Sequence, residues 1–262
     1  MRFALTNGGR VEAQPLGSGE CPFCGMPMVA RCGEERVWHW AHKGRRDCDP
    51  WWENETEWHR SWKDEFPADW QEIAHQANDG ERHIADVKTG DGWVLEFQHS
   101  AIPRIERQSR ENFYQSLIWV VDGLRRKKDA RQFYEAWSNG QKSRDPFSTK
   151  RRISSPTGAL LYDWAASQAH IFFDFGDKRL WWLFSGSDDV RAYVQDISRE
   201  QFVRIHRETN TRGPAEFDSL VQNFCAFIAT YESPPVTSTP QRPTTKFPGL
   251  RRAQPIRRSP RL

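Results

Sequence analysis

The chain has 262 residues, of which 37% are hydrophobic and 28% charged, and its mean hydropathy of −0.82 is that of a polar protein that can still fold. No apolar run approaches the roughly 18 residues of a membrane span, and the N-terminal MRFALTNGG lacks the apolar segment of a secretory signal. We therefore expect a cytoplasmic protein without a membrane partner, whose five cysteines are reduced thiols or metal ligands.

The net charge of +3 is unevenly distributed along the chain. The residues after Glu232 include seven basic side chains and no acidic one: Arg242, Lys246, Arg251, Arg252, Arg257, Arg258 and Arg261. Residues 1–232 therefore carry a net −4, and residues 233–262 carry +7. This tail has little to bury, so we expect it to be disordered. A basic arm on a mildly acidic body indicates a polyanionic partner, although a solvated tail that keeps the protein soluble has the same composition.

Residues 1–50 are rich in Gly and Cys and predict a small module of short strands. Cys21 and Cys24, two residues apart in CPFC, can hold one ion from a tight turn. His42 and Cys48 complete the pattern C-x2-C-x17-H-x5-C. Four protein ligands leave no open position on the metal, so the pattern predicts a structural zinc ion rather than a catalytic one.

The second pair of zinc ligands has an alternative. Cys32 and His39 lie in the same segment and compete with His42 and Cys48 for these positions. We favour His42 and Cys48, and expect Cys32 and His39 to be ordinary core or surface residues.

Residues 51–137 alternate helix and strand patterns. ENETEWHRSWKDEF predicts a helix whose buried stripe is Trp58, Trp62 and Phe66. Two strand-like runs separated by the turn TGDG then predict a hairpin. A helix from about Pro103 and the buried strand LIWVV follow, so that the order is α-β-β-α-β.

The predicted hairpin places three polar side chains together. Glu96 and Gln98 share one face of their strand, while Leu95 and Phe97 share the face expected to form the core. Asp86 should lie close to Glu96 across the turn. Two such carboxylates repel unless a proton or cation lies between them, and a hard divalent cation such as Mg²⁺ fits this requirement. The alternative is an exposed hairpin whose polar side chains simply face water.

The remainder of the chain predicts a second, smaller unit. Residues 138–157 have loop composition and predict a linker or insertion. In residues 158–232, HIFFDFG and RLWWLF predict a strand pair, and FDSLVQNFCAFIATYE predicts an amphipathic helix. The apolar face of this helix should be Leu220, Phe224, Phe227 and Ile228.

The order α-β-β-α-β, with D-x9-E-x-Q on the hairpin, resembles the core of the PD-(D/E)xK nucleases. CPFC, HWAH, ETEWHRSWK, IADV, EFQHS and R-x3-Y before LIWVVDG resemble, in this order, the competence protein CoiA family over residues 15–123. That family joins a small N-terminal module with cysteines and histidines to a nuclease-like core. The resemblance implies an α+β or α/β fold with a zinc-binding module at 1–50, a PD-(D/E)xK (restriction-endonuclease-like) core at 51–137, and a C-terminal α+β segment at 158–232.

The resemblance also implies roles for the hairpin residues. Asp86 and Glu96 would be the carboxylates that bind the catalytic metal, and Gln98 stands where many relatives carry Lys. Gln can hydrogen-bond to water or phosphate but carries no charge. Glu57 borders the buried stripe of the preceding helix and could reach the metal as a third acid, or could be an acid favoured at a helix start by the macrodipole.

Several basic side chains are candidates for contacts with phosphate. His59 and Lys63 are four residues apart and share one stripe of the first helix, where they could contact a phosphate or be plain surface residues. Arg104 and Arg110 on the second helix are further candidates. RRKK at residues 125–128 predicts a general electrostatic patch. The tail adds Arg251, Arg252, Arg257 and Arg258.

We expect a Mg²⁺- or Mn²⁺-dependent deoxyribonuclease that acts in DNA uptake and recombination or in defence against foreign DNA. Ions held by Asp86 and Glu96 would lower the pKa of a bound water and neutralise charge on the scissile phosphate. The alternative is a non-cleaving accessory protein on a degenerate nuclease fold, with DNA or a recombination protein as its partner. Gln98 and the absence of a second obvious base favour that alternative.

Overall fold

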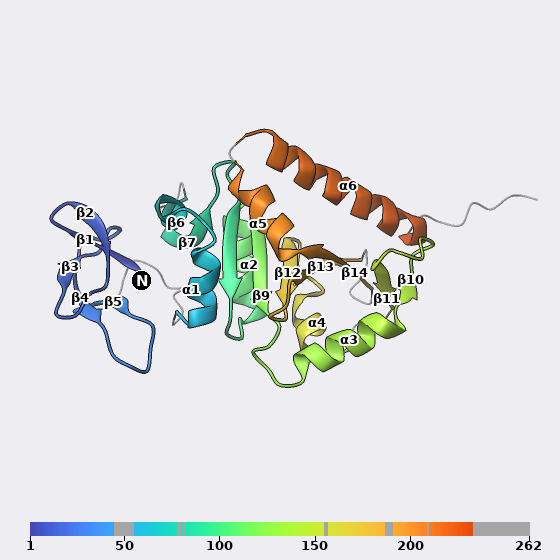
Figure 1. Ribbon diagram of the computed structural model, residues 1–262, viewed down its shortest axis with the longest axis horizontal. Helices are drawn as coiled ribbons and strands as arrows, with labels where there is room; N and C mark the ends of the chain where they lie inside the picture. Colours follow the sequence, from blue (N-terminus) through green and yellow to red (C-terminus); the bar gives the residue numbers. More distant parts are fainter. Residues whose placement is uncertain are drawn as a thin grey trace, which may run out of the picture. The chain divides into compact units, whose positions relative to one another are not determined.

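The computed structural model describes residues 1–44, 55–77, 80, 82–154, 157–186, 191–208 and 210–232 (Figure 1). Within these residues the protein is a mixed α+β structure with two sheets and six α-helices. Residues 1–232 form one compact unit. Cys48 and the basic tail, with Arg251, Arg252, Arg257 and Arg258, lie outside the described residues. In the described part of the chain, no helix combines the length and apolar character needed to cross a membrane.

Five short antiparallel strands form the N-terminal sheet, in the order β2-β1-β3-β4-β5: β1 (Phe3–Thr6), β2 (Gly9–Glu12), β3 (Ser18–Glu20), β4 (Pro27–Arg31) and β5 (His39–His42). Asn7 and Gly8 join β1 to β2 with φ angles of 51° and 80°, the left-handed pair that a tight hairpin turn requires. A small core of Met28, Trp40 and Cys21 packs within this sheet.

Nine strands form the second sheet, in the order β10-β11-β14-β13-β12-β9-β8-β7-β6: β6 (Gln71–Gln76), β7 (Arg82–Lys88), β8 (Val94–Gln98), β9 (Leu117–Asp122), β10 (Gln141–Lys142), β11 (Arg151–Ile153), β12 (His170–Asp174), β13 (Arg179–Ser185) and β14 (Ala192–Ser198). The three central strands β8, β9 and β12 run parallel, and the other pairs are antiparallel. The carboxyl ends of three neighbouring strands therefore meet at one edge of the sheet.

Helices cover both faces of this sheet (Figure 1): α1 (Glu57–Lys63), α2 (Arg104–Phe113), α3 (Asp129–Asn139), α4 (Ala159–Trp164), α5 (Arg199–Arg207) and α6 (Arg212–Glu232). One apolar cluster joins Trp119 of β9 to Phe133 of α3 and Trp164 of α4. The other joins Trp62 of α1 to the strands and to side chains of α5 and α6, including Phe202. Because both faces are covered, every residue of β8 is buried.

Most of the expected elements are present. The first helix is α1, in which Trp62 is buried and Trp58 partly buried, and Phe66 is buried just after the helix ends. The Thr56 side chain caps the helix by accepting from the backbone N–H of His59. The hairpin is β7–β8, with Val87 opposite Leu95. The helix after Pro103 is α2, LIWVV lies in β9, and HIFFD and RLWWLF pair as β12 and β13. The last amphipathic helix is α6, which buries Phe224 and Phe227.

Two features differ from the expected order. A third strand, β6, precedes the hairpin, so the order is α-β-β-β-α-β rather than α-β-β-α-β. Its sequence QEIAHQ shows no alternation of apolar and polar residues, and the strand is also irregular at Glu72, which has a left-handed φ of 48°. Residues 138–157, expected to be a linker or insertion, contain β10 and β11, and β11 pairs with β14 at the edge of the sheet. These strands are short and basic, so their composition is that of a loop.

Candidate functional site

A cysteine and histidine cluster lies at one end of the N-terminal sheet. The CPFC turn is closed by hydrogen bonds from the Gly25 N–H to the Cys21 carbonyl and from the Cys21 N–H to the Met26 carbonyl, both 2.9 Å long. Gly25 has a φ of 70°, which favours glycine at this position. The strand β5 brings His42 opposite Met28, beside the turn. Cys24 Sγ lies 3.3 Å from His42 Nε2.

The chemistry of these three side chains and the distances between their ligand atoms suit zinc. The ligand atoms of Cys21, Cys24 and His42 all lie within 4.8 Å of one another. Two ligand atoms at tetrahedral positions about 2.0–2.3 Å from one ion lie about 3.5 Å apart, which matches the separation of the Cys24 and His42 atoms. The alternatives Cys32 and His39 are not in this cluster, and His39 Nδ1 instead hydrogen-bonds to the Val37 carbonyl at 2.8 Å.

A second polar cluster lies where the strands β7 and β8 separate. Their ladder includes Lys88 with Val94 and Val87 with Leu95, and the same register sets Asp86 opposite Glu96. Side chains replace the ladder there: the Phe97 N–H donates to Asp86 Oδ2 at 3.0 Å, and the Asp86 N–H donates to Glu96 Oε1 at 3.4 Å. The two carboxylates thus satisfy backbone groups that the separating strands leave unpaired.

The strand β7 is irregular at Asp86. Residues two apart in a regular strand share a face, yet Ala85 packs in the cluster of Trp119 while Val87 packs in the cluster of Trp62 on the other face. On the other side of β7, the pairs Gln71 with Val87 and Ile73 with Ala85 set the left-handed Glu72 opposite Asp86. Asp86 therefore lies between two acids, Glu72 on β6 and Glu96 on β8. Local distortions of this kind re-aim side chains and concentrate next to functional sites.

Two side chains of α1 approach the Asp86 carboxylate. His59 Nε2 lies 2.8 Å from Asp86 Oδ2, and Lys63 Nζ lies 3.6 Å from Asp86 Oδ1. Burial alone would raise the pKa of Asp86, but His59, Lys63 and the Phe97 N–H together lower this pKa to about 2. The carboxylate is therefore ionised at neutral pH.

Lys63 is the hub of a buried ion-pair network. Its Nζ also lies 3.2 Å from Glu55 Oε1 and 3.2 Å from Glu72 Oε1. Burial would lower the pKa of Lys63, but Glu55, Glu72 and Asp86 raise it above its ordinary value. Burial would likewise raise the pKa values of Glu55 and Glu72, but the charge of Lys63 lowers both below their ordinary values. The backbone N–H groups of Arg2 and Phe3 donate to Glu72 at 2.6 and 3.1 Å.

Glu96 and Gln98 are held by other groups. Arg110 of α2 is buried, and its Nη1 lies 3.3 Å from Glu96 Oε2. Gln98 Nε2 donates to the Ser100 carbonyl at 3.2 Å. The Glu96 side chain is 6% exposed and that of Asp86 is 16% exposed, so Asp86 is the more accessible of the two acids.

The comparisons with known proteins concern the N-terminal module. Residues 14–50 match the family model described as "Competence protein CoiA, N-terminal domain". The similarity to this family therefore covers residues 14–50 of the chain. This match supports the expected resemblance to the competence protein CoiA family. No curated protein and no solved structure matches the chain.

The matched segment contains three of the four predicted zinc ligands as a cluster, and the fourth, Cys48, lies outside the described residues. Of the other predicted residues, the structure brings His59 and Lys63 to Asp86, and Arg110 to Glu96. His59 and Lys63 are buried rather than plain surface residues.

Two predicted residues lie at the surface. Glu57 in the first turn of α1 is exposed, and so is Arg104 at the start of α2. The acid that contacts Lys63 from the region of α1 is instead Glu55, two residues earlier. Glu55 and Glu72 are two acids of the site that were not predicted from the sequence patterns. The run E-x-E at 55–57 was a signal for the first, whereas Glu72 lies in a strand that the hydrophobic pattern did not reveal.

Proposed function

We propose that the protein is a metal-dependent nuclease that hydrolyses phosphodiester bonds in DNA, with Asp86, Glu96 and Gln98 at its centre. One observation carries the proposal. Asp86 and Glu96, on neighbouring strands of a buried sheet, meet where the strands separate, and Gln98 follows two residues later. Buried acids are rare unless something compensates their charge, and strand irregularities and acids with shifted pKa values are both over-represented at active sites.

The donor set is suited to Mg²⁺ or Mn²⁺. Asp86 and Glu96 supply hard carboxylate oxygens, and Asp86 is the more exposed of the two. A divalent cation bound there would lower the pKa of a coordinated water and neutralise charge on the scissile phosphate.

Other side chains of the chain supply the remaining chemistry. Gln98 is uncharged, so it would orient a water or a phosphate oxygen by hydrogen bonding. The positive charge that Gln98 lacks would come from Lys63, because its Nζ lies 3.6 Å from Asp86 Oδ1 and its raised pKa keeps it protonated. Arg110, beside Glu96, would hold that carboxylate ionised and in place.

The CoiA N-terminal domain supports a role connected with competence, which is the role that the family's name describes. A nuclease or a DNA-binding protein serves DNA uptake and recombination equally well. Defence against foreign DNA is the alternative setting for the same chemistry.

The decisive experiment is a cleavage assay with the purified full chain. Single-stranded, nicked and duplex DNA are incubated with and without Mg²⁺ or Mn²⁺, using the parent, Asp86→Asn, Glu96→Gln and the control Glu135→Gln, an exposed acid on α3. We expect metal-dependent products from the parent and the control, and a loss of about a hundredfold or more in the other two. Cleavage that persists in both Asp86→Asn and Glu96→Gln would rule out this site.

A second candidate function is DNA binding without cleavage. The observation that favours it is that Asp86 and Glu96 already have protein partners, Lys63 and Arg110. Moreover, among the described residues the only cluster with three ligand atoms within 4.8 Å is that of Cys21, Cys24 and His42. Binding of DNA by a parent that cuts none of the substrates with either metal would favour this function.

A further inference from the structure

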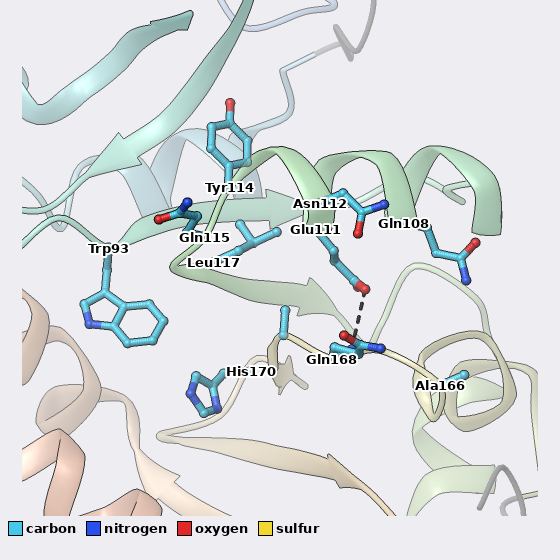
Figure 2. Close-up of a pocket in the computed structure, with 11 residues that line it drawn as sticks. Trp93, Gln108, Glu111, Asn112, Tyr114, Gln115, Leu117, Ala166, Gln168 and His170 are labelled. Atoms are coloured by element: carbon cyan, nitrogen blue, oxygen red, sulfur yellow. Dashed lines mark hydrogen bonds between the residues drawn. The ribbon is translucent and has the colours of Figure 1, made fainter. Parts of the chain in front are cut away.

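A polar cavity of about 400 Å³ (Figure 2) is lined by residues at the beginning of the central parallel strands. Gln98 lies at the opposite end of these strands. Trp93 directly precedes β8, Leu117 begins β9 and His170 begins β12, and these three parallel strands run away from the cavity. Gln98 ends β8 at the far edge. The cavity is therefore separate from the cluster of Asp86 and Glu96, and its volume lies in the range of about 300–1,000 Å³ that is usual for small-molecule sites.

Four of the side chains that line the cavity are amides. Gln108 and Asn112 lie on α2, Gln115 lies just after this helix, and Gln168 lies on the facing segment before β12 (Figure 2). All four side chains are exposed. Each amide offers both hydrogen-bond donors and an acceptor, so together they can pair with a ligand whose edge alternates donors and acceptors.

Two aromatic rings close the other end of the cavity. The Trp93 and His170 rings have centroids 5.5 Å apart, and Trp93 also packs edge-to-face on Phe217 at 5.4 Å. These contacts fix the Trp93 ring, which is half-buried and faces the cavity (Figure 2). Burial lowers the pKa of His170 to about 4, so this ring is neutral at pH 7. The cavity thus combines an aromatic surface with uncharged hydrogen-bonding groups.

The charge of the cavity disfavours an anionic ligand. Among the described residues that line it, none is Lys or Arg. Its acid, Glu111, is held by the Ser167 hydroxyl at 2.6 Å and by Arg107 Nε at 3.3 Å. A phosphate would find no cation here, whereas an uncharged planar ring would find both stacking and amide partners.

We propose that this cavity binds a nucleobase. The base would stack on Trp93 and pair its polar edge with the amides of Gln115 and Gln168. Its sugar and any phosphates would remain outside, because the wall offers no cation to them. Stacking on aromatic side chains and hydrogen bonding of exposed base edges are the two contacts by which proteins hold unpaired bases. The proposal is independent of cleavage at Asp86.

The base can come from a free nucleoside or from an unpaired position in a nucleic-acid strand, and calorimetry on the full chain without added divalent cation separates the two. Adenosine, guanosine, cytidine and thymidine are titrated, with ribose as the sugar-only control. The variant is Gln115→Ala/Gln168→Ala, and the matched control is Gln222→Ala, an exposed glutamine of α6. We expect at least one nucleoside to saturate the parent, with an affinity that falls about tenfold or more in the double variant and is unchanged in the control.

Two DNA single strands of equal length, one intact and one abasic, show whether the bound base belongs to a strand or to a free nucleoside. If the base belongs to a strand, the intact strand binds the parent more tightly than the abasic strand, and the double variant removes this difference. If it belongs to a free nucleoside, both strands bind alike while nucleoside binding still depends on Gln115 and Gln168. The proposal is overturned if no nucleoside saturates the parent, if ribose binds as well as a nucleoside, or if the double variant binds like the parent.

Discussion

The Nζ atom of Lys63 lies 3.6 Å from Oδ1 of Asp86, and the same ammonium group contacts Glu55 and Glu72 at 3.2 Å. A helix and two strands are thus joined by one buried cation. The sequence pattern predicts that neighbouring carboxylates on the hairpin repel unless a cation lies between them. The structure identifies cationic side chains beside these acids, Lys63 at Asp86 and Arg110 at Glu96.

Lys63→Met should destabilise the protein strongly. The substitution keeps most of the apolar side chain but leaves the carboxylates of Glu55, Glu72 and Asp86 without their shared partner. Breaking a buried ion pair in this way costs about 3–5 kcal/mol. Urea unfolding measures the effect. The control Lys127→Met, at an exposed lysine, should change the unfolding free energy by less than about 0.5 kcal/mol. A Lys63→Met protein as stable as this control would contradict the role of Lys63 as a hub.

The Asp86 carboxylate should make stability depend on pH in the acidic range. Its pKa in the folded protein is about 2, below its ordinary value of 3.8, so the folded state favours the ionised form. The resulting stabilisation is present above about pH 4 and is lost as the pH falls through about 2. A difference of this size corresponds to about 2 kcal/mol.

Unfolding of the parent and of Asp86→Asn between pH 2 and pH 6 measures this contribution. Asp86→Asn should be less stable than the parent at pH 6, and the two should converge as the pH approaches 2. Asp218→Asn, at an exposed acid of α6, serves as the control and should follow the parent throughout. An Asp86→Asn protein that is equally or more stable at pH 6 would mean that repulsion from Glu72 and Glu96 outweighs the pairing with Lys63.

The N-terminal module should contain about one zinc ion per chain. Cys21, Cys24 and His42 hold their ligand atoms within 4.8 Å of one another, and metal binding in such a small module is coupled to its folding. Metal analysis of the purified protein should find near one equivalent, and Cys21→Ser should remove it. Cys225→Ser, at an exposed cysteine of α6, should retain the metal. A folded parent without metal would disprove the zinc site.

The hairpin and its acids could be predicted because their information is local. TGDG specifies the turn, the alternation of Leu95 and Phe97 with Glu96 specifies the faces, and the turn then fixes the register that sets Asp86 opposite Glu96. The CPFC turn is local in the same way. The third ligand of the predicted zinc site, His42, lies on β5, and its distance from the cysteines along the sequence was enough to predict it.

The ion-pair network was not predicted because it depends on the strand β6, which carries Glu72 and which the hydrophobic pattern does not reveal. The sequence QEIAHQ of β6 does not alternate apolar and polar residues, so the pattern gives no signal for a strand there. Without β6 there was no reason to place Glu72 near Lys63. Likewise, the indole N–H groups of Trp58 and Trp62 donate to Asp174, more than a hundred residues away, at 3.0 and 2.9 Å. Pairing over such separations is decided by the packing of the whole sheet.

The substitution Gln98→Lys tests whether Lys63 already supplies the positive charge of the proposed nuclease. Gln98 is buried, and its side-chain amide donates to the Ser100 carbonyl, so a longer lysine has to displace this contact. If Lys63 provides the charge, Gln98→Lys gives little gain, and its cleavage rate should stay within about tenfold of the parent. Gln98→Leu, which removes hydrogen bonding without adding charge, should slow cleavage less than Asp86→Asn does.

Cleavage rates at several Mg²⁺ concentrations, each with a thermal melt of the same variant, distinguish a loss of chemistry from a loss of folding. A rise of about a hundredfold in the cleavage rate of Gln98→Lys would contradict the role of Lys63. It would show that the reaction needs a positive charge that Lys63 does not supply.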